Sequence, residues 1–129
     1  MNEVVADTHA AIWYFLDQPR LSTAAIAALD AAPRIILPSI CIVEVIYLVE
    51  KGRIAVAALQ RLESELADPA AALTIASLDF DVAKAIERVP RALVPDLPDR
   101  IIAATALVRN IPVVSRDRKI QSSGVNTIW

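Results

Sequence analysis

The chain has 129 residues, of which 56% are hydrophobic and 22% are charged, and its formal net charge is -2. This size and composition predict a single globular domain over residues 1–129 and exclude a disordered chain. The slightly negative charge argues against binding nucleic acid through bulk electrostatics. No uncharged apolar run is long enough for a membrane-spanning helix, because Glu44 and Glu50 interrupt the best candidate.

The N-terminal segment MNEVVADTHA has neither the basic stretch nor the cleavage site of a secretory leader. We therefore expect a soluble, cytoplasmic protein with no membrane partner. The one cysteine, Cys41, excludes an internal disulfide and a cysteine-based zinc site. Its apolar neighbours in sequence predict a thiol buried in the core.

Strand and helix signals alternate along the chain. Short apolar runs predict strands at residues 3–6, 34–37, 73–77, 112–115 and 125–129. Helical patterns cover residues 10–17, 22–32, 40–51, 56–67, 79–89 and 99–109, and the proline-rich segment 91–98 is expected to be an irregular loop. Strands separated by helices form right-handed βαβ units, so we predict an α/β domain with a parallel sheet.

Four acidic residues occupy positions that such a sheet brings together. Asp7 ends the first apolar run, Asp117 follows the run at 111–115, Asp99 opens a helical pattern, and Glu44 lies inside an apolar helix. In an open α/β sheet, strand C-termini and helix N-termini share one edge, which is where ligands bind. The three aspartates also have an ordinary explanation as helix-capping or turn residues.

Glu44 is harder to explain as a surface residue. Its neighbours one helical turn away are Ile40, Tyr47 and Leu48. A carboxylate on such an apolar stripe must reach the surface, take up a proton or find a partner, because a buried unpaired charge is costly.

Convergence of these carboxylates would determine their chemistry. Two like charges about 4 Å apart repel by roughly 4 kcal/mol at an effective dielectric constant near 20. A cluster of oxygen ligands is suited to Mg²⁺ or Mn²⁺ and unsuited to zinc. A hard divalent ion that retains water ligands supports hydrolysis of phosphate esters, so we predict metal-dependent phosphodiester hydrolysis.

The two parts of the chain differ in charge. Residues 1–83 contain 5 Lys or Arg and 11 Asp or Glu, whereas residues 84–129 contain 8 and 4. The basic part is either an ordinary mixed-charge surface or a set of phosphate contacts, for which the arginine fork is well suited.

Several motifs together resemble a known family. They are DTH at residues 7–9, the pattern PSxxxxE at 38–44, DRIIAATA at 99–106 and VVSRD at 113–117. In this combination the chain resembles PIN-domain ribonucleases, and more narrowly the VapC-type toxins of toxin-antitoxin pairs. The resemblance implies a PIN-like three-layer fold, with a small parallel sheet of four to five strands and helices on both faces. It also implies a Mg²⁺- or Mn²⁺-dependent endoribonuclease acting on single-stranded RNA, a homodimer, and inhibition by a cognate antitoxin.

The resemblance assigns roles to individual residues. Asp7, Glu44, Asp99 and Asp117 match the acidic quartet of the family, with Asp7 and Asp99 as the expected direct metal ligands and Glu44 next. Asp117 is expected to bind through water or to hold a second ion. Thr8 and Ser115 match the small polar residues that support the quartet.

Some positions leave alternatives open. Asp96 lies three residues before Asp99, and we expect a loop or capping role for it because only Asp99 adjoins the IIAATA helix. His9 is interpreted as an early helical residue rather than a general base, and a contact with substrate is the alternative role. Trp13 is expected in the core or a dimer interface. Asn110 stands where glycine is common in the family, and it also tolerates a left-handed conformation.

Other functions fit less well. Haloacid-dehalogenase-like phosphatases need D-x-D where this chain has Asp7 and His9, and receiver domains need adjacent acidic residues after the first strand. Nucleotide binding through a glycine-rich loop is excluded because Gly52 and Gly124 are the only glycines. The remaining alternative is a catalytically silent PIN-like module that binds RNA or protein.

Overall fold

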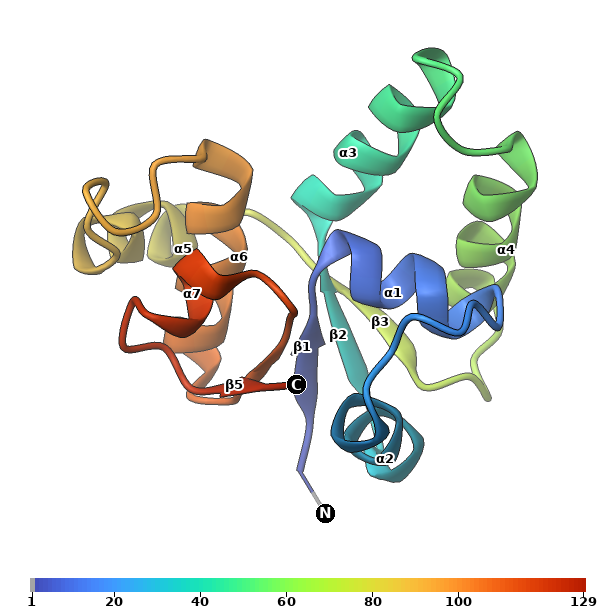
Figure 1. Ribbon diagram of the computed structural model, residues 1–129, viewed down its shortest axis with the longest axis horizontal. Coiled ribbons are helices and arrows are strands. Elements are labelled where there is room, and N and C mark those ends of the chain that lie inside the picture. The colour runs from blue at the N-terminus through green and yellow to red at the C-terminus, as the bar shows by residue number, and fades with distance from the viewer. Residues whose placement is uncertain (1) are drawn as a thin grey trace.

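Five short strands form one sheet in the computed structural model, which describes residues 2–129 (Figure 1). Every neighbouring pair of strands is parallel, and the order across the sheet is β3-β2-β1-β4-β5. The strands are β1 (Val4–Ala6), β2 (Ile35–Pro38), β3 (Leu73–Ala76), β4 (Val113–Val114) and β5 (Thr127–Ile128).

The helices lie in two layers. From β1 the chain moves through β2 to β3 in one direction, and it then returns past β1 to β4 and β5. Because these crossovers are right-handed, the helices of the two halves cover opposite faces of the sheet. The first layer contains α1 (Thr8–Phe15), α2 (Thr23–Ala31), α3 (Ser39–Glu50) and α4 (Val56–Ala67); the second contains α5 (Phe80–Ala85), the 3₁₀ turn η1 (Ile86–Arg88), α6 (Leu97–Arg109) and α7 (Arg118–Gln121). The predicted three-layer α/β fold is confirmed.

The central strand β1 is buried on both faces. Val5 pairs in register with Ile36 of β2 and with Val113 of β4, and all three side chains are at most 1% exposed. Helix α6 packs on β1, β2 and β4 from one side, while α1 contacts α3 and α4 on the other side. A strand enclosed in this way needs a continuous apolar sequence, which explains the short VVA segment. Cys41 is fully buried, as predicted.

Helix boundaries differ from the predictions at several places. Helix α1 spans Thr8–Phe15 rather than residues 10–17, because the Asp7 side chain caps it. Helix α6 begins at Leu97, because the Asp96 side chain caps it and Pro98 is tolerated in a first turn. The helix expected over residues 79–89 instead ends at Ala85 and continues as the η1 turn. The four-residue helix α7 was not predicted, since a single turn is too short to show a periodic pattern. Within residues 2–129, no helix combines the length and apolarity needed to cross a bilayer.

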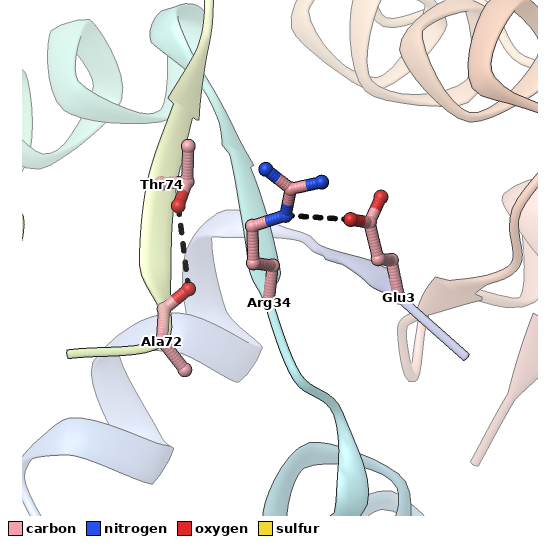
Figure 2. Close-up of polar contacts among 4 residues, drawn as sticks. All are labelled: Glu3, Arg34, Ala72 and Thr74. Atoms are coloured by element: carbon pink, nitrogen blue, oxygen red, sulfur yellow. Dashed lines mark hydrogen bonds and ion pairs between the residues drawn. The ribbon is translucent and has the colours of Figure 1, made fainter. Parts of the chain in front are cut away.

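The N-terminal ends of β1 and β2 are joined by an ion pair. The Arg34 guanidinium lies 2.6 Å from the Glu3 carboxylate, just before the two strands begin (Figure 2). Nearby, the Thr74 hydroxyl of β3 donates to the Ala72 carbonyl at 3.4 Å (Figure 2). The Arg34 side chain is largely exposed, so this pair contributes at most about 1 kcal/mol. The predicted acidic residues lie at the opposite, C-terminal edge.

Candidate active site

The sheet has a topological switch point between β1 and β4. After β1 the chain enters α1 and moves toward β2, whereas after β4 it enters α7 and moves toward β5. Connections that leave neighbouring parallel strands in opposite directions open a crevice at the strand C-termini, where ligands bind in such folds. Asp7 directly follows β1, and Asp117 comes three residues after the end of β4. Two of the predicted residues therefore flank this crevice.

Three of the aspartates cap helices. Asp7 Oδ1 accepts the Ala10 N–H at 2.8 Å, and Asp117 Oδ1 accepts the Lys119 N–H at 2.8 Å. Asp96 Oδ1 accepts the N–H of Asp99 at 3.0 Å, which confirms the capping role expected for Asp96. Because the helix N-termini face the C-terminal edge of the sheet, capping brings these carboxylates to that edge and is compatible with a shared site.

The predicted acidic residues line one cavity of about 440 Å³. Asp7 and Glu44 reach it from the first helical layer, and Asp99 reaches it from α6. Its full lining consists of Asp7, Thr8, His9, Trp13, Arg20, Glu44, Asp96, Asp99, Ile102, Arg116 and Asp117. The structure thus brings together the whole predicted quartet and adds Asp96 as a fifth carboxylate.

Glu44 is held by the residue that follows Asp7. The Thr8 hydroxyl donates to Glu44 Oε1 at 2.5 Å, across the gap between α1 and α3. Thr8 is only 4% exposed, so its hydroxyl is fixed in place. The partner that the sequence required for Glu44 is therefore Thr8, and this contact directs the carboxylate into the cavity.

Ser115 is fully buried and is not part of the cavity lining. Its Oγ accepts the Asp117 N–H at 3.0 Å, and its carbonyl accepts the Gln121 side-chain amide at 3.1 Å. The Ser115 side chain also forms a hydrogen bond that favours the charged form of Asp7. This residue therefore shapes the turn carrying Asp117 and supports Asp7 at the same time.

Burial and mutual repulsion disfavour charge on these carboxylates. Burial is the main reason that the pKa values of Asp7 and Glu44 lie above their ordinary values. The pKa of Asp99 is raised to about 7, first by burial and then by the neighbouring charges of Asp96 and Asp117. A carboxyl group with such a pKa is partly protonated at neutral pH and can exchange its proton for a cation.

The chemical type of these ligands fits a hard divalent cation, but the side chains are not arranged around a common metal position. All the charged ligands at the cavity are carboxylate oxygens, which suit Mg²⁺ or Mn²⁺. No group of three or more His, Cys, Asp or Glu side chains within residues 2–129 stands in a metal-binding arrangement. Burial and the neighbouring carboxylates nevertheless raise the pKa of Asp99, and a bound cation would offset both effects.

Two arginines and a tryptophan of the cavity were not predicted as site residues. Trp13 is 9% exposed, in agreement with the expected core position, yet its ring also borders the cavity. Arg116 Cζ lies 4.8 Å from the centroid of that ring, and Arg20 Cζ lies 5.8 Å from it. The excess of basic residues after position 83 pointed to Arg116, whereas nothing in the sequence singled out Arg20. His9 borders the cavity with an exposed side chain.

Comparison with known proteins decides the family. The family model of the PIN domain matches residues 4–124. The chain belongs to the PIN-domain family. This PIN domain is 32% identical over 122 residues to Ribonuclease VapC22 of Mycobacterium tuberculosis, with 95% of this chain and 92% of that protein covered. The predicted resemblance to VapC-type PIN domains is confirmed.

Solved structures show the same PIN fold. The crystal structure of VapBC2 from Rickettsia felis bound to a promoter DNA fragment contains a chain with a TM-score of 0.72 and 16% identity, and 97% of this chain and 96% of that chain are covered. A toxin-antitoxin complex from Klebsiella pneumoniae contains another, with a TM-score of 0.70, 23% identity, and coverage of 98% and 96%. At these identities the likeness shows the fold of the PIN domain.

Proposed function

We propose that this PIN domain is a Mg²⁺- or Mn²⁺-dependent endoribonuclease that hydrolyses phosphodiester bonds of single-stranded RNA. The observation that carries the proposal is the convergence of Asp7, Glu44, Asp99 and Asp117 on one cavity at the switch point of the sheet. The similarity to Ribonuclease VapC22 over nearly the whole chain supports the same reaction class.

Each residue has a role in this proposal. Asp7 and Asp99 are the direct metal ligands, and Glu44, oriented by Thr8, is the next ligand. Asp117 also lines the cavity, and its carboxylate acts through a water molecule or on a second ion. When bound, the metal ion polarises the phosphoryl oxygen and lowers the pKa of a water molecule.

The acid-base properties of Asp99 agree with a ligand role. Its pKa of about 7 means that the metal-free cluster retains a proton near neutral pH. Binding of a cation releases this proton, because a divalent charge strongly favours the ionised carboxylate. Asp99 is half-buried and thus remains accessible to an ion from solvent.

The proposal is tested by cleavage of single-stranded RNA with Mg²⁺ or Mn²⁺ and with EDTA. We expect Asp7→Asn and Asp99→Asn to abolish cleavage while leaving the fold intact. Asparagine can replace Asp7 as the cap of α1, and Asp99 makes no capping hydrogen bond in α6, whose cap is Asp96. Asp79→Asn is the matched control, because Asp79 caps α5 through the Val82 N–H and lies outside the cavity lining. Cleavage by Asp99→Asn at the parental rate would show that the ligand assignment is wrong.

We further propose that the chain is the toxin of a type II toxin-antitoxin pair in the cytoplasm and that a cognate antitoxin protein inhibits it. Two structural relatives are described as a VapBC complex and a toxin-antitoxin complex, which supports this role. Expression of the chain alone should arrest growth, and sequencing of RNA ends soon after induction should locate the cleaved RNA. Normal growth and unchanged RNA ends would contradict a toxin.

A homodimer is part of the same proposal. Large apolar side chains are exposed on three helices: Tyr47 of α3 at 56%, Phe80 of α5 at 78% and Leu97 of α6 at 57%. Burial of such residues against a second copy would remove apolar surface from water. Light scattering of the purified chain measures its mass directly, and a monomer at micromolar concentration would contradict the dimer.

A catalytically silent PIN-like module that binds RNA or protein is the second candidate. It is favoured by one observation, namely that residues 2–129 contain no ready-made arrangement of three metal ligands. The cleavage assay separates the two candidates. RNA binding without metal-dependent cleavage would support the silent module.

A further inference from the structure

Two arginine side chains lie against one tryptophan ring at the cavity. Arg116 Cζ is 4.8 Å and Arg20 Cζ is 5.8 Å from the centroid of the Trp13 ring. The two arginines come from segments nearly a hundred residues apart, after β4 and after α1, and both border the acidic cavity. The tertiary structure thus places two positive charges beside five carboxylates.

The Trp13 ring is a fixed platform. It is nearly buried, and it packs against the rings of His9 and Trp129 with centroid distances of 5.5 Å and 6.0 Å. Trp13 also belongs to α1, the helix that Asp7 caps, and Arg116 directly precedes Asp117. The positions of both arginines are therefore coupled to those of the carboxylates.

Both guanidinium groups keep their hydrogen-bond donors available. Arg20 and Arg116 are exposed, and within residues 2–129 neither forms an ion pair with a carboxylate, although both border a cavity rich in carboxylates. If neutralising the acidic cluster were their role, direct pairing with Asp7, Asp99 or Asp117 would be expected. Stacking on an aromatic face instead leaves the N–H groups at the edge of the guanidinium plane free for another acceptor.

A single-stranded RNA, which carries a negative charge on each phosphate, needs such hydrogen-bond donors at this cavity. Five carboxylates repel the phosphates of an approaching RNA, and bulk attraction is weak because the chain has a net charge of -2. Local arginines overcome this repulsion, since the planar fork donates two hydrogen bonds to one phosphate group. Two arginines on one ring offer such contacts on the border of the catalytic carboxylates.

We propose that Arg20 and Arg116, stacked on Trp13, form a phosphate clamp that holds single-stranded RNA so that the scissile bond faces the carboxylates. This inference rests on the proposed nuclease function and adds the residues that bind the substrate backbone. The clamp contacts phosphates and therefore contributes affinity and register rather than base specificity.

The clamp is tested by binding, separately from cleavage. Fluorescence anisotropy of a labelled oligouridine is measured in EDTA, so that no hydrolysis occurs, at several salt concentrations. We expect Arg20→Met and Arg116→Met each to weaken binding several-fold at low salt. The plot of the logarithm of the association constant against the logarithm of the salt concentration should have a shallower slope, by about 0.7 for each phosphate that the variant no longer binds. Arg116→Lys should keep the slope while losing affinity, because lysine retains the charge without the planar fork.

Arg109→Met provides the matched control. It removes the same charge at the C-terminal end of α6, whereas Asp99 lies in the first turn of that helix, at the cavity. The clamp is overturned if Arg20→Met and Arg116→Met bind oligouridine as Arg109→Met does while keeping the melting temperature of the parent.

In cleavage assays the clamp variants should raise KM more than they lower kcat. Absence of cleavage by the parent, with intact arginine-dependent binding, would overturn the nuclease proposal and leave the clamp standing.

Discussion

At the scale of single residues, the acidic side chains of the cavity serve local structure and the site together. Asp7 and Asp117 cap helices with hydrogen bonds of 2.8 Å, and the same side chains border the cavity. Capping uses one oxygen of each carboxylate, so the other oxygen remains for a ligand. Stability and proposed chemistry are therefore tested with substitutions that retain the cap and remove the charge.

The raised pKa of Asp99 predicts how stability depends on pH. Between its ordinary value of 3.8 and about 7, the folded protein retains a proton that the unfolded chain loses. Stability of the metal-free protein should therefore fall as pH rises through this window. Asp99→Asn should weaken the dependence and stabilise the metal-free protein at mildly alkaline pH by about 1 to 2 kcal/mol, a value reduced for solvent screening of a half-exposed group.

This expectation is checked by urea denaturation in EDTA at mildly acidic and mildly alkaline pH. Asp79→Asn, outside the cavity, should show the parental pH dependence. A parent protein that is equally stable at both pH values would contradict the raised pKa that burial and neighbouring charges give Asp99.

The contact between Thr8 and Glu44 predicts a second effect. Thr8→Val keeps the shape of the side chain but removes the donor to Glu44 Oε1. We expect the free energy of unfolding to fall by about 1 to 2 kcal/mol, because a carboxylate loses a hydrogen bond. The affinity for Mn²⁺ should also fall, since Glu44 is no longer oriented. Thr74→Val, which removes a 3.4 Å bond to the Ala72 carbonyl, is the control and should leave metal affinity unchanged.

At the scale of elements, helix α6 distinguishes the roles of Asp96 and Asp99, two aspartates whose roles were ambiguous from the sequence. Asp96 is its N-cap and Asp99 lies in its first turn, so both carboxylates border the cavity from one helix end. A negative charge there is also favoured by the helix dipole, by about 0.3 to 1 kcal/mol. The capping hydrogen bond gives Asp96 a structural role that Asp99 does not share.

Asp96→Ala should lower the free energy of unfolding by about 0.5 to 2 kcal/mol, because the cap is removed. Asp96→Ser restores a capping oxygen and should recover this stability. Cleavage of single-stranded RNA should persist in Asp96→Ser and disappear in Asp99→Asn. If instead Asp96→Ser is inactive and fully folded, Asp96 belongs to the metal ligands and the assignment from the helix motif is wrong.

At the scale of the whole molecule, the order of the strands creates the site. Placing β1 between β2 and β4 makes the chain leave neighbouring strands in opposite directions, and the acidic residues converge at that point. Local hydrogen bonds and the surrounding core oppose the mutual repulsion, and the two arginines that border the cavity form no ion pair with these carboxylates. A divalent cation that binds the folded state should therefore stabilise the entire domain.

We expect Mn²⁺ at about 100 times its Kd to raise the melting temperature by about 5 to 15 °C, and EDTA to reverse the shift. Asp99→Asn should respond much less, whereas Asp79→Asn should respond as the parent does. Differential scanning fluorimetry measures the melting temperature of the parent and of each variant with Mn²⁺ and with EDTA. A melting temperature that is indifferent to Mn²⁺ in the parent would contradict a shared cation site.

The sequence by itself determined the fold class and most of the elements. Apolar runs such as 3–6 and 34–37 predicted strands that the structure contains as Val4–Ala6 and Ile35–Pro38, and residues 56–67 were predicted to be helical with the observed bounds. These signals are local, since a buried strand must be apolar and a helix must end at its caps and prolines. The acidic quartet was also named from sequence, because motifs and strand ends have fixed positions along the chain.

Only the tertiary structure decided which side chains meet. The pairing of Thr8 with Glu44 and the stacking of Arg20 and Arg116 on Trp13 join segments that are distant in sequence. No local pattern encodes such contacts, because they depend on strand order and on how the helical layers pack. The raised pKa of Asp99 has the same origin: burial and the fields of neighbouring carboxylates arise only when the folded chain brings those charges together.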